Sequence, residues 1–253
     1  MIPMFPLMHV KAAVDIAGYF NDDLILGSLL PDVLRLSGCH WGRSHKAANF
    51  LKSVLGKCHN ITVGSLLHGE SPPGADYFSD VSFLNVPWGW AFYTAWRYSP
   101  KYLKKILPVG LLPWLLHNMV EAAVDLYIYE SWNRDLIDHI ADISSWDVSW
   151  EEIDILVKKS GLKTKRKLKQ AYVDYLSISL KTYGEEKGVF FAIYEILRRK
   201  LYRHGFIIDI PSNFFEEFWY KLYVRRSELY YEYVRVSYPY LKETYERWCL
   251  GEI

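Results

Sequence analysis

The stretch Leu116-His-Asn-Met-Val-Glu-Ala-Ala-Val-Asp-Leu126 places His117, Glu121 and Asp125 at positions i, i+4 and i+8 of an otherwise apolar segment. On a helix of about 3.6 residues per turn, these three side chains share one stripe and point the same way. The apolar setting turns that stripe toward the protein interior, where an unpaired carboxylate is costly to desolvate. A divalent metal ion would satisfy the stripe, and so would a buried hydrogen-bond network or pairing with Lys or Arg.

Helical periodicity extends from this segment toward both ends of the 253-residue chain. We expect helices at residues 9–20, 23–30, 45–55, 111–130, 169–183, 189–202, 212–231 and 240–250. Pro31 should end or kink the second of these, because proline lacks a backbone N–H and clashes with the preceding turn. A doubtful alternation of apolar and polar residues occurs at 206–210. The sequence therefore predicts an all-α fold.

The character of the chain changes near residue 148. Six of the eight histidines lie within the first 120 residues, whereas the later part is rich in Lys, Glu and Tyr. We therefore expect a metal-binding helical core at residues 1–148 and a helical C-terminal extension, residues 149–253, packed on that core.

The overall composition is that of an ordinary globular protein, with 51% apolar and 23% charged residues. A formal net charge of +1 gives no global basic field for nucleic-acid binding. Cys39, Cys58 and Cys249 form no even framework, which favours reduced intracellular thiols. No signal-peptide pattern is visible, and the longest apolar run is about half of the roughly 20 residues that span a bilayer. We expect a cytoplasmic protein without a transmembrane segment.

Four more residues of metal-ligand type lie in or at the end of apolar helical segments. They are His9, Asp32, His45 and His68. Neutral imidazole and ionised carboxylate are the usual nitrogen and oxygen ligands of zinc and can be mixed in one site. Each residue alone is weak evidence, but five such positions, counting His117, are hard to explain as separate accidents.

The order of these residues resembles that of a known family. Gly27-Ser-Leu-Leu-Pro-Asp32 is followed by His45 thirteen residues later, by Gly64-x-x-x-His68, and after a long gap by His117-x-x-x-Glu121. This pattern, over residues 9–130, resembles the zinc-dependent phospholipase C and P1-type nuclease superfamily. The resemblance implies an all-α, multi-helix core that contains two or three zinc ions and cleaves phosphoester bonds in phospholipids or nucleic acids.

Carried onto this sequence, the resemblance implies metal ligands at His9, Asp32, His45, His68, His117 and Glu121. It also makes Asp32 a candidate general base. Asp125 lies one turn beyond the His117–Glu121 pair. We assign it as an additional ligand or as a residue that hydrogen-bonds a ligating imidazole.

Two departures from the family pattern affect the expected metal content. The family has a bridging aspartate four residues after the fourth ligand, where this chain has Pro72, and it has a further histidine that this chain lacks before His117. Asp76 is the candidate replacement for the bridging carboxylate, and Glu70 is a poorer one. We therefore expect one or two zinc ions, or other divalent metals, rather than three.

The resulting prediction is a metal-dependent phosphoesterase that uses metal-bound water on a phosphoester substrate, such as a lipid headgroup or a nucleotide. The alternative is a non-catalytic helical scaffold, or a peripheral membrane or interaction protein, that retains the fold with a partial metal site.

Other motifs receive simpler interpretations. Cys39-His40 and Cys58-His59 could in principle form a zinc site, but adjacent ligands are atypical. Asp138-His139 has the reverse order of the His-Asp signature of metal phosphohydrolases and lacks a second pair. The basic run at residues 163–169 is interpreted as a solvated helix face.

Overall fold

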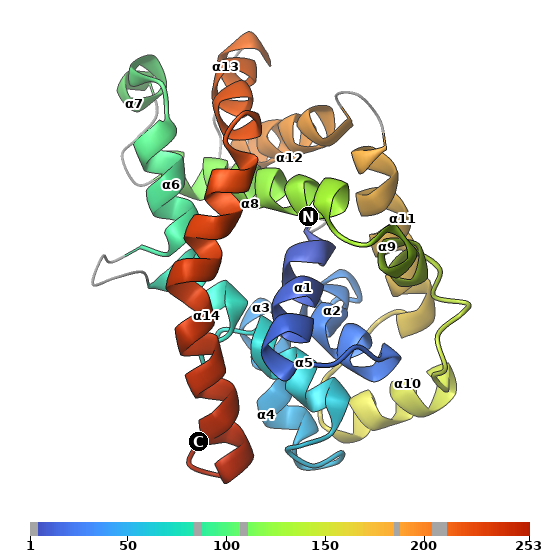
Figure 1. The fold of residues 1–253 in the computed structure, drawn as a ribbon. Helices are drawn as coiled ribbons and strands as arrows, with labels where there is room; N and C mark the ends of the chain where they lie inside the picture. Colours follow the sequence, from blue (N-terminus) through green and yellow to red (C-terminus); the bar gives the residue numbers. More distant parts are fainter. Residues whose placement is uncertain (1–4, 83–87, 107–110, 185–187, 204–211) are drawn as a thin grey trace.

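The computed structural model describes residues 5–82, 88–106, 111–184, 188–203 and 212–253 (Figure 1). Up to residue 148 it contains α1 (Pro6–Ala17), α2 (Asp22–Leu36), α3 (Trp41–Ser44), α4 (Ala47–Leu51), α5 (Asn60–His68), the π-helical turn η1 (Tyr77–Val81), α6 (Trp90–Tyr98), α7 (Lys101–Ile106), α8 (Leu111–Ser131) and α9 (Arg134–Ala141). After residue 148 it contains α10 (Trp150–Lys159), α11 (Leu168–Tyr183), α12 (Gly188–Arg203), α13 (Ser212–Tyr223) and α14 (Arg226–Leu250). These ranges include no strand, which confirms the predicted all-α class. The doubtful alternation at 206–210 lies outside them.

At the centre of the molecule, α1, α2 and α5 pack together, and α8 crosses the N-terminal end of α1 (Figure 1). Two glycines let α2 and α5 approach closely. A Cβ at Gly27 would overlap the Ile61 carbonyl, and a Cβ at Gly64 would lie 2.5 Å from Ser28 N. Backbone contact at this crossing fixes the distance between two helices that both contribute to the candidate site.

Pro31 lies inside α2 rather than at its end. Of the two outcomes expected there, a helix end is excluded, because α2 continues to Leu36. The proline leaves the Gly27 carbonyl without its usual helical donor. That carbonyl instead accepts a hydrogen bond from Ser65 Oγ on α5 at 3.0 Å. The helix therefore tolerates its proline, and Asp32 lies within α2.

The helices after residue 148 share a hydrophobic core with the earlier ones. One cluster of buried side chains includes Leu29 of α2, Val120 of α8, Tyr175 of α11 and Phe218 of α13. Figure 1 shows α14 running along α1 and α5, which thus gain a further neighbour.

The boundaries of the last two helices differ from the prediction. The helix expected at 212–231 ends at Tyr223, and α14 then runs without interruption from Arg226 to Leu250 through Pro239. Within the described ranges, no helix combines the length and apolarity needed to cross a membrane.

Candidate metal centre

The structure gathers six of the seven predicted ligands and adds two aspartates. Ligand-type atoms lie within 4.8 Å of one another in three groups: His9, His68 and Asp76; Asp32, His45 and His68; Asp80, His117 and Glu121. The first two groups share His68 and are almost fully buried. The residues come from α1, α2, the turn between α3 and α4, α5, α8 and the segment around η1, so the site requires several elements of the N-terminal part of the chain to pack together.

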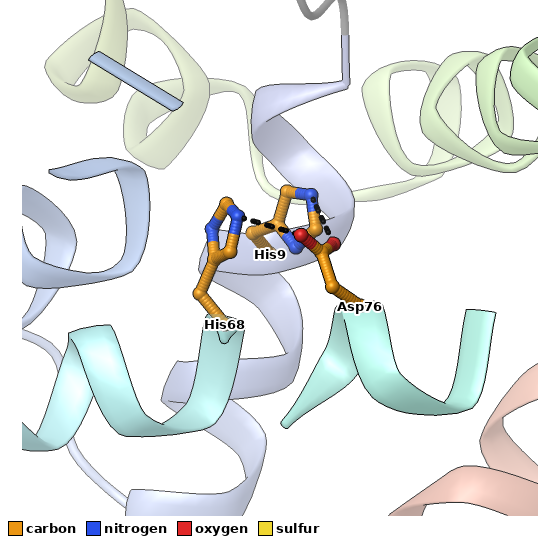
Figure 2. A group of neighbouring side chains, drawn as sticks. All are labelled: His9, His68 and Asp76. Atoms are coloured by element: carbon orange, nitrogen blue, oxygen red, sulfur yellow. Dashed lines mark ion pairs between the residues drawn. The ribbon is translucent and has the colours of Figure 1, made fainter. Parts of the chain in front are cut away.

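Asp76 lies at the middle of the first two groups. Figure 2 shows His9, His68 and Asp76 directed toward one another from three separate segments. The Asp76 carboxylate lies 3.6 Å from His9 Nε2, 3.1 Å from His45 Nε2 and 3.3 Å from His68 Nε2. Asp76, named as the replacement for the missing bridging carboxylate, is therefore placed among the predicted histidines, whereas Glu70 accepts a hydrogen bond from Trp41 Nε1 at 3.0 Å.

Hydrogen bonds to Nδ1 orient two of the histidine rings. His68 Nδ1 lies 2.5 Å from the Ser28 carbonyl, which can only accept, so this nitrogen holds a proton. His45 Nδ1 lies 2.9 Å from Ser44 Oγ, whose own proton goes to the Trp41 carbonyl. Both Nε2 atoms are directed at carboxylates, and this is the arrangement by which proteins prepare imidazoles for a metal. Burial opposes protonation of the rings, but Asp32 and Asp76 raise the pKa of His45 to about 10 and Asp76 raises the pKa of His68, so without a cation both rings hold a proton on Nε2.

The polar atoms of the first two groups fit a metal ion. Among the described residues, His45 Nε2 and His68 Nε2 are buried and make no hydrogen bond of good geometry. Buried polar groups are normally satisfied, and a metal ion that displaces the protons from these nitrogens would leave them free to coordinate it. A divalent cation among these nitrogens and the oxygens of Asp32 and Asp76 would satisfy both partners.

The charge balance of this half of the site depends on its histidines. Burial opposes ionisation of Asp32, but the facing His45, His68 and His9 outweigh it and hold the Asp32 pKa below its ordinary value. The same balance places the pKa of Asp76 well below its ordinary range. Burial lowers the pKa of His9 to about 4, with His68 contributing. Both carboxylates are therefore ionised at neutral pH and available as ligands.

The third group contains more negative charge. Asp80, four residues after Asp76 in η1, faces His117 and Glu121 of α8. Burial raises the Glu121 pKa to about 8, although the hydrogen bonds donated by Ser79 and Asn118 act to lower it. Burial, with Glu121 and Asp76 nearby, raises the Asp80 pKa well above its ordinary range. Without a cation, this group retains a proton, and a metal ion could take its place.

Tyr175 of α11 reaches the site from the C-terminal part of the chain. Its buried hydroxyl donates to Asp32 Oδ2 at 2.9 Å, while Asp32 Oδ1 lies 3.6 Å from His45 Nε2. The tyrosine therefore fixes the carboxylate and leaves one oxygen directed at the histidine ring.

Asp125 has a different role from the predicted one. Its carboxylate accepts hydrogen bonds from Leu7 N, Met8 N and Tyr183 Oη, and no ligating imidazole is among its recorded partners. It also belongs to none of the three groups of ligand-type atoms in the described part of the chain. Two donors are free backbone N–H groups in the first turn of α1, where a carboxylate is favoured. The prediction of Asp125 as a ligand, or as a partner of a ligating imidazole, is wrong in this structure.

The remaining motifs lie apart from these groups. Cys39, His40, Cys58 and His59 enter none of the three groups formed by the described residues. His139 Nε2 pairs with Asp22 Oδ1 at 2.6 Å in a half-buried position away from the three groups. These observations favour the simpler interpretations of both motifs.

Sequence reasoning missed Asp80, Ser79 and Tyr175. A signal for Asp80 was present, since Asp76-x-x-x-Asp80 repeats the i, i+4 spacing of His117 and Glu121. Ser79 and Tyr175 act through contacts between residues distant in sequence, which no local pattern reveals.

The described residues thus establish a buried set of imidazoles and carboxylates that could hold metal ions, without identifying the metal. No family model, curated protein or solved structure matches this chain.

Proposed function

We propose that this protein is a metal-dependent phosphoester hydrolase related to the zinc-dependent phospholipase C and P1-type nucleases. The observation that supports it is the convergence of Asp32, His45, His68 and Asp76 beside a second group, Asp80, His117 and Glu121. We call the three groups of ligand-type side chains described above the metal-ready groups. Adjacent groups of mixed imidazole and carboxylate suit zinc. Two neighbouring divalent ions are a recurrent solution for phosphoester cleavage.

The roles of the residues follow from their surroundings. Asp76, His45 and His68 would hold one ion, with His9 beside them, while His117, Glu121 and Asp80 would hold a second. When bound, such ions activate water and neutralise charge on the phosphoryl group. The lowered pKa of Asp32 suits a carboxylate that stays ionised and orients water as a hydrogen-bond acceptor, more than one that removes its proton.

Metal analysis and hydrolysis assays test this proposal together. We expect purified protein to contain one or two equivalents of a divalent metal and to hydrolyse chromogenic phosphodiesters or phosphomonoesters after loading with zinc or manganese. Asp76→Asn should lower metal content and reduce kcat/KM by about 100-fold or more. His40→Asn is the matched control, because exposed His40 only caps α3 and asparagine can also cap a helix.

The outcomes separate the proposal from its alternative. Only trace metal, together with no hydrolysis after addition of zinc, manganese or iron, would overturn it. Stoichiometric metal that depends on Asp76, without hydrolysis of any phosphoester, would instead favour a non-catalytic helical scaffold that retains the site.

A further inference from the structure

Two of the three cysteines lie close together on the surface although they stand at positions 58 and 249 of the chain. Cys58 and Cys249 are both free and exposed, whereas Cys39 is buried. Cys58 lies just before α5, and Cys249 lies in the last turn of α14. The fold therefore brings two accessible thiols from distant segments to one place.

Hydrogen bonds between the neighbouring residues fix this arrangement. Trp248 Nε1 donates to the Lys57 carbonyl at 2.9 Å, so each cysteine directly follows a residue of this bonded pair. Lys57 Nζ also donates to the Ile253 carbonyl at 3.2 Å. Burial and the nearby Cys58 thiol both raise the pKa of Cys249, in keeping with the placement that the Trp248–Lys57 hydrogen bond gives the two thiols.

The anchor beneath the thiols is rigid. The Trp248 ring is completely buried, and the ammonium groups of Lys52 and Lys57 lie 5.0 and 5.5 Å from its centroid. The end of α14 is thus held against the segment before α5 by a packed aromatic ring, a cation–π pair and a hydrogen bond. Such an anchor keeps the two thiols within reach of each other.

We propose that Cys58 and Cys249 form a redox modification site, at which a low-molecular-weight disulfide such as oxidised glutathione converts the two thiols into an intramolecular disulfide. One cysteine attacks the glutathione disulfide and releases the first glutathione as a thiol. The other cysteine attacks the resulting mixed disulfide and releases the second glutathione. Two protein thiols are oxidised, one glutathione disulfide is reduced, and the two protons end on the two glutathione thiols.

The second step is favoured over a second glutathione adduct because the neighbouring thiol is already positioned. The product would tie the end of α14 to the segment before α5, the helix that ends at His68. This inference is independent of the proposed hydrolase function, since neither cysteine belongs to the metal-ready groups.

The test combines thiol counting with peptide mapping of the intact protein. Trypsin separates the cysteines into peptides 36–43, 58–97 and 248–253, which contain Cys39, Cys58 and Cys249 in turn. After incubation with oxidised glutathione, we expect two of the three thiols to be lost. A linked peptide pair, 58–97 with 248–253, should appear and be reversed by dithiothreitol. The linked protein should also melt at a higher temperature than the reduced protein, because the link restricts the unfolded chain.

Two variants complete the design. Cys39→Ala should still form the link, whereas Cys58→Ser should leave Cys249 as a stable glutathione adduct. Glutathione adducts on both exposed cysteines of the unsubstituted protein, without the linked peptide pair, would overturn the proposal. So would a link that includes Cys39.

Discussion

At the residue scale, Tyr175 shows how a side chain distant in sequence affects the metal-ready groups. Its hydroxyl donates to Asp32 Oδ2, and both residues are buried. We expect Tyr175→Phe to weaken metal binding by about 10- to 100-fold, because the carboxylate loses the donor that orients it. Competition with a chromogenic chelator measures the affinity.

Tyr172→Phe is the matched control for this substitution. Tyr172 is equally buried on α11, but its hydroxyl donates to the Leu26 carbonyl at 2.6 Å and contacts no ligand-type side chain. Equal losses of metal affinity in the two variants would show that Tyr175 acts only through general stability.

Asp125 allows a second test at the residue scale. We expect Asp125→Asn to retain metal while losing about 1–3 kcal/mol of unfolding free energy, because an amide serves the N–H donors of α1 less well than a carboxylate. Glu121→Gln, on the same helix, should instead lose metal. Denaturant unfolding and metal analysis of both variants distinguish a stabilising residue from a metal ligand. Loss of metal from the Asp125→Asn variant would show that Asp125 is a ligand after all.

The pH dependence of metal binding follows from the third group. The Glu121 pKa is raised to about 8, so a metal must displace a proton at lower pH. Release of this proton should make affinity rise with pH up to about 8, by at most about tenfold per unit, and the protons displaced from His45 and His68, whose pKa values are also raised, should add to this dependence. In the metal-free protein, the unfolding free energy changes with pH in the opposite direction to the metal affinity. The folded state binds the Glu121 proton more tightly than the unfolded chain does, so the unfolding free energy falls as pH rises from 4.5 to about 8.

Isothermal titration with zinc across this pH range measures the slope. Glu121→Gln removes this titrating carboxyl group and should reduce the slope below pH 8 while weakening binding. An affinity that stays constant with pH would contradict displacement of a proton from this group.

At the element scale, the crossing of α2 and α5 controls the spacing of Asp32 and His68. A Cβ at Gly64 would overlap the Leu24 carbonyl and lie 2.5 Å from Ser28 N. We expect Gly64→Ala to cost about 1–3 kcal/mol of unfolding free energy and to reduce metal content, because backbone atoms must separate. Gly184→Ala is the control, since its nearest neighbour would lie at 3.7 Å, an ordinary contact.

The helices themselves were the more predictable part of the molecule. Apolar periodicity and spacing were sufficient for the stripe of His117 and Glu121, because both properties are local to α8. Asp80 was missed because its i, i+4 spacing from Asp76 falls in a short π-helical turn rather than in a segment with apolar helical periodicity. Asp125 was misassigned because its spacing is the same whether it faces a metal or the backbone of α1.

At the scale of the whole molecule, the two predicted segments depend on each other. Core side chains from both segments lie in one cluster, and Tyr175 connects the later segment to Asp32. The change in composition near residue 148 gave no information about the contact between Tyr175 and Asp32, because these two residues are far apart in the chain.

Metal removal should therefore affect the stability of the entire protein. Ligand binding to the folded state adds about 4 kcal/mol when free metal is about 1,000 times Kd, which corresponds to about 10 °C in Tm for a chain of this size. We expect a chelator to lower Tm by this order and added zinc to restore it. Asp76→Asn should respond to neither treatment, and an unchanged Tm in the unsubstituted protein would contradict metal binding.

Pro31 has a consequence for the evolution of this chain. The proline leaves the Gly27 carbonyl without a donor in its own helix, and Ser65 Oγ on the neighbouring helix donates a hydrogen bond to it. A hydrogen bond that ordinarily belongs to one helix has become a bond between two. In related sequences, proline at position 31 and serine at position 65 should therefore co-vary, because each residue is tolerated or needed only when the other is present.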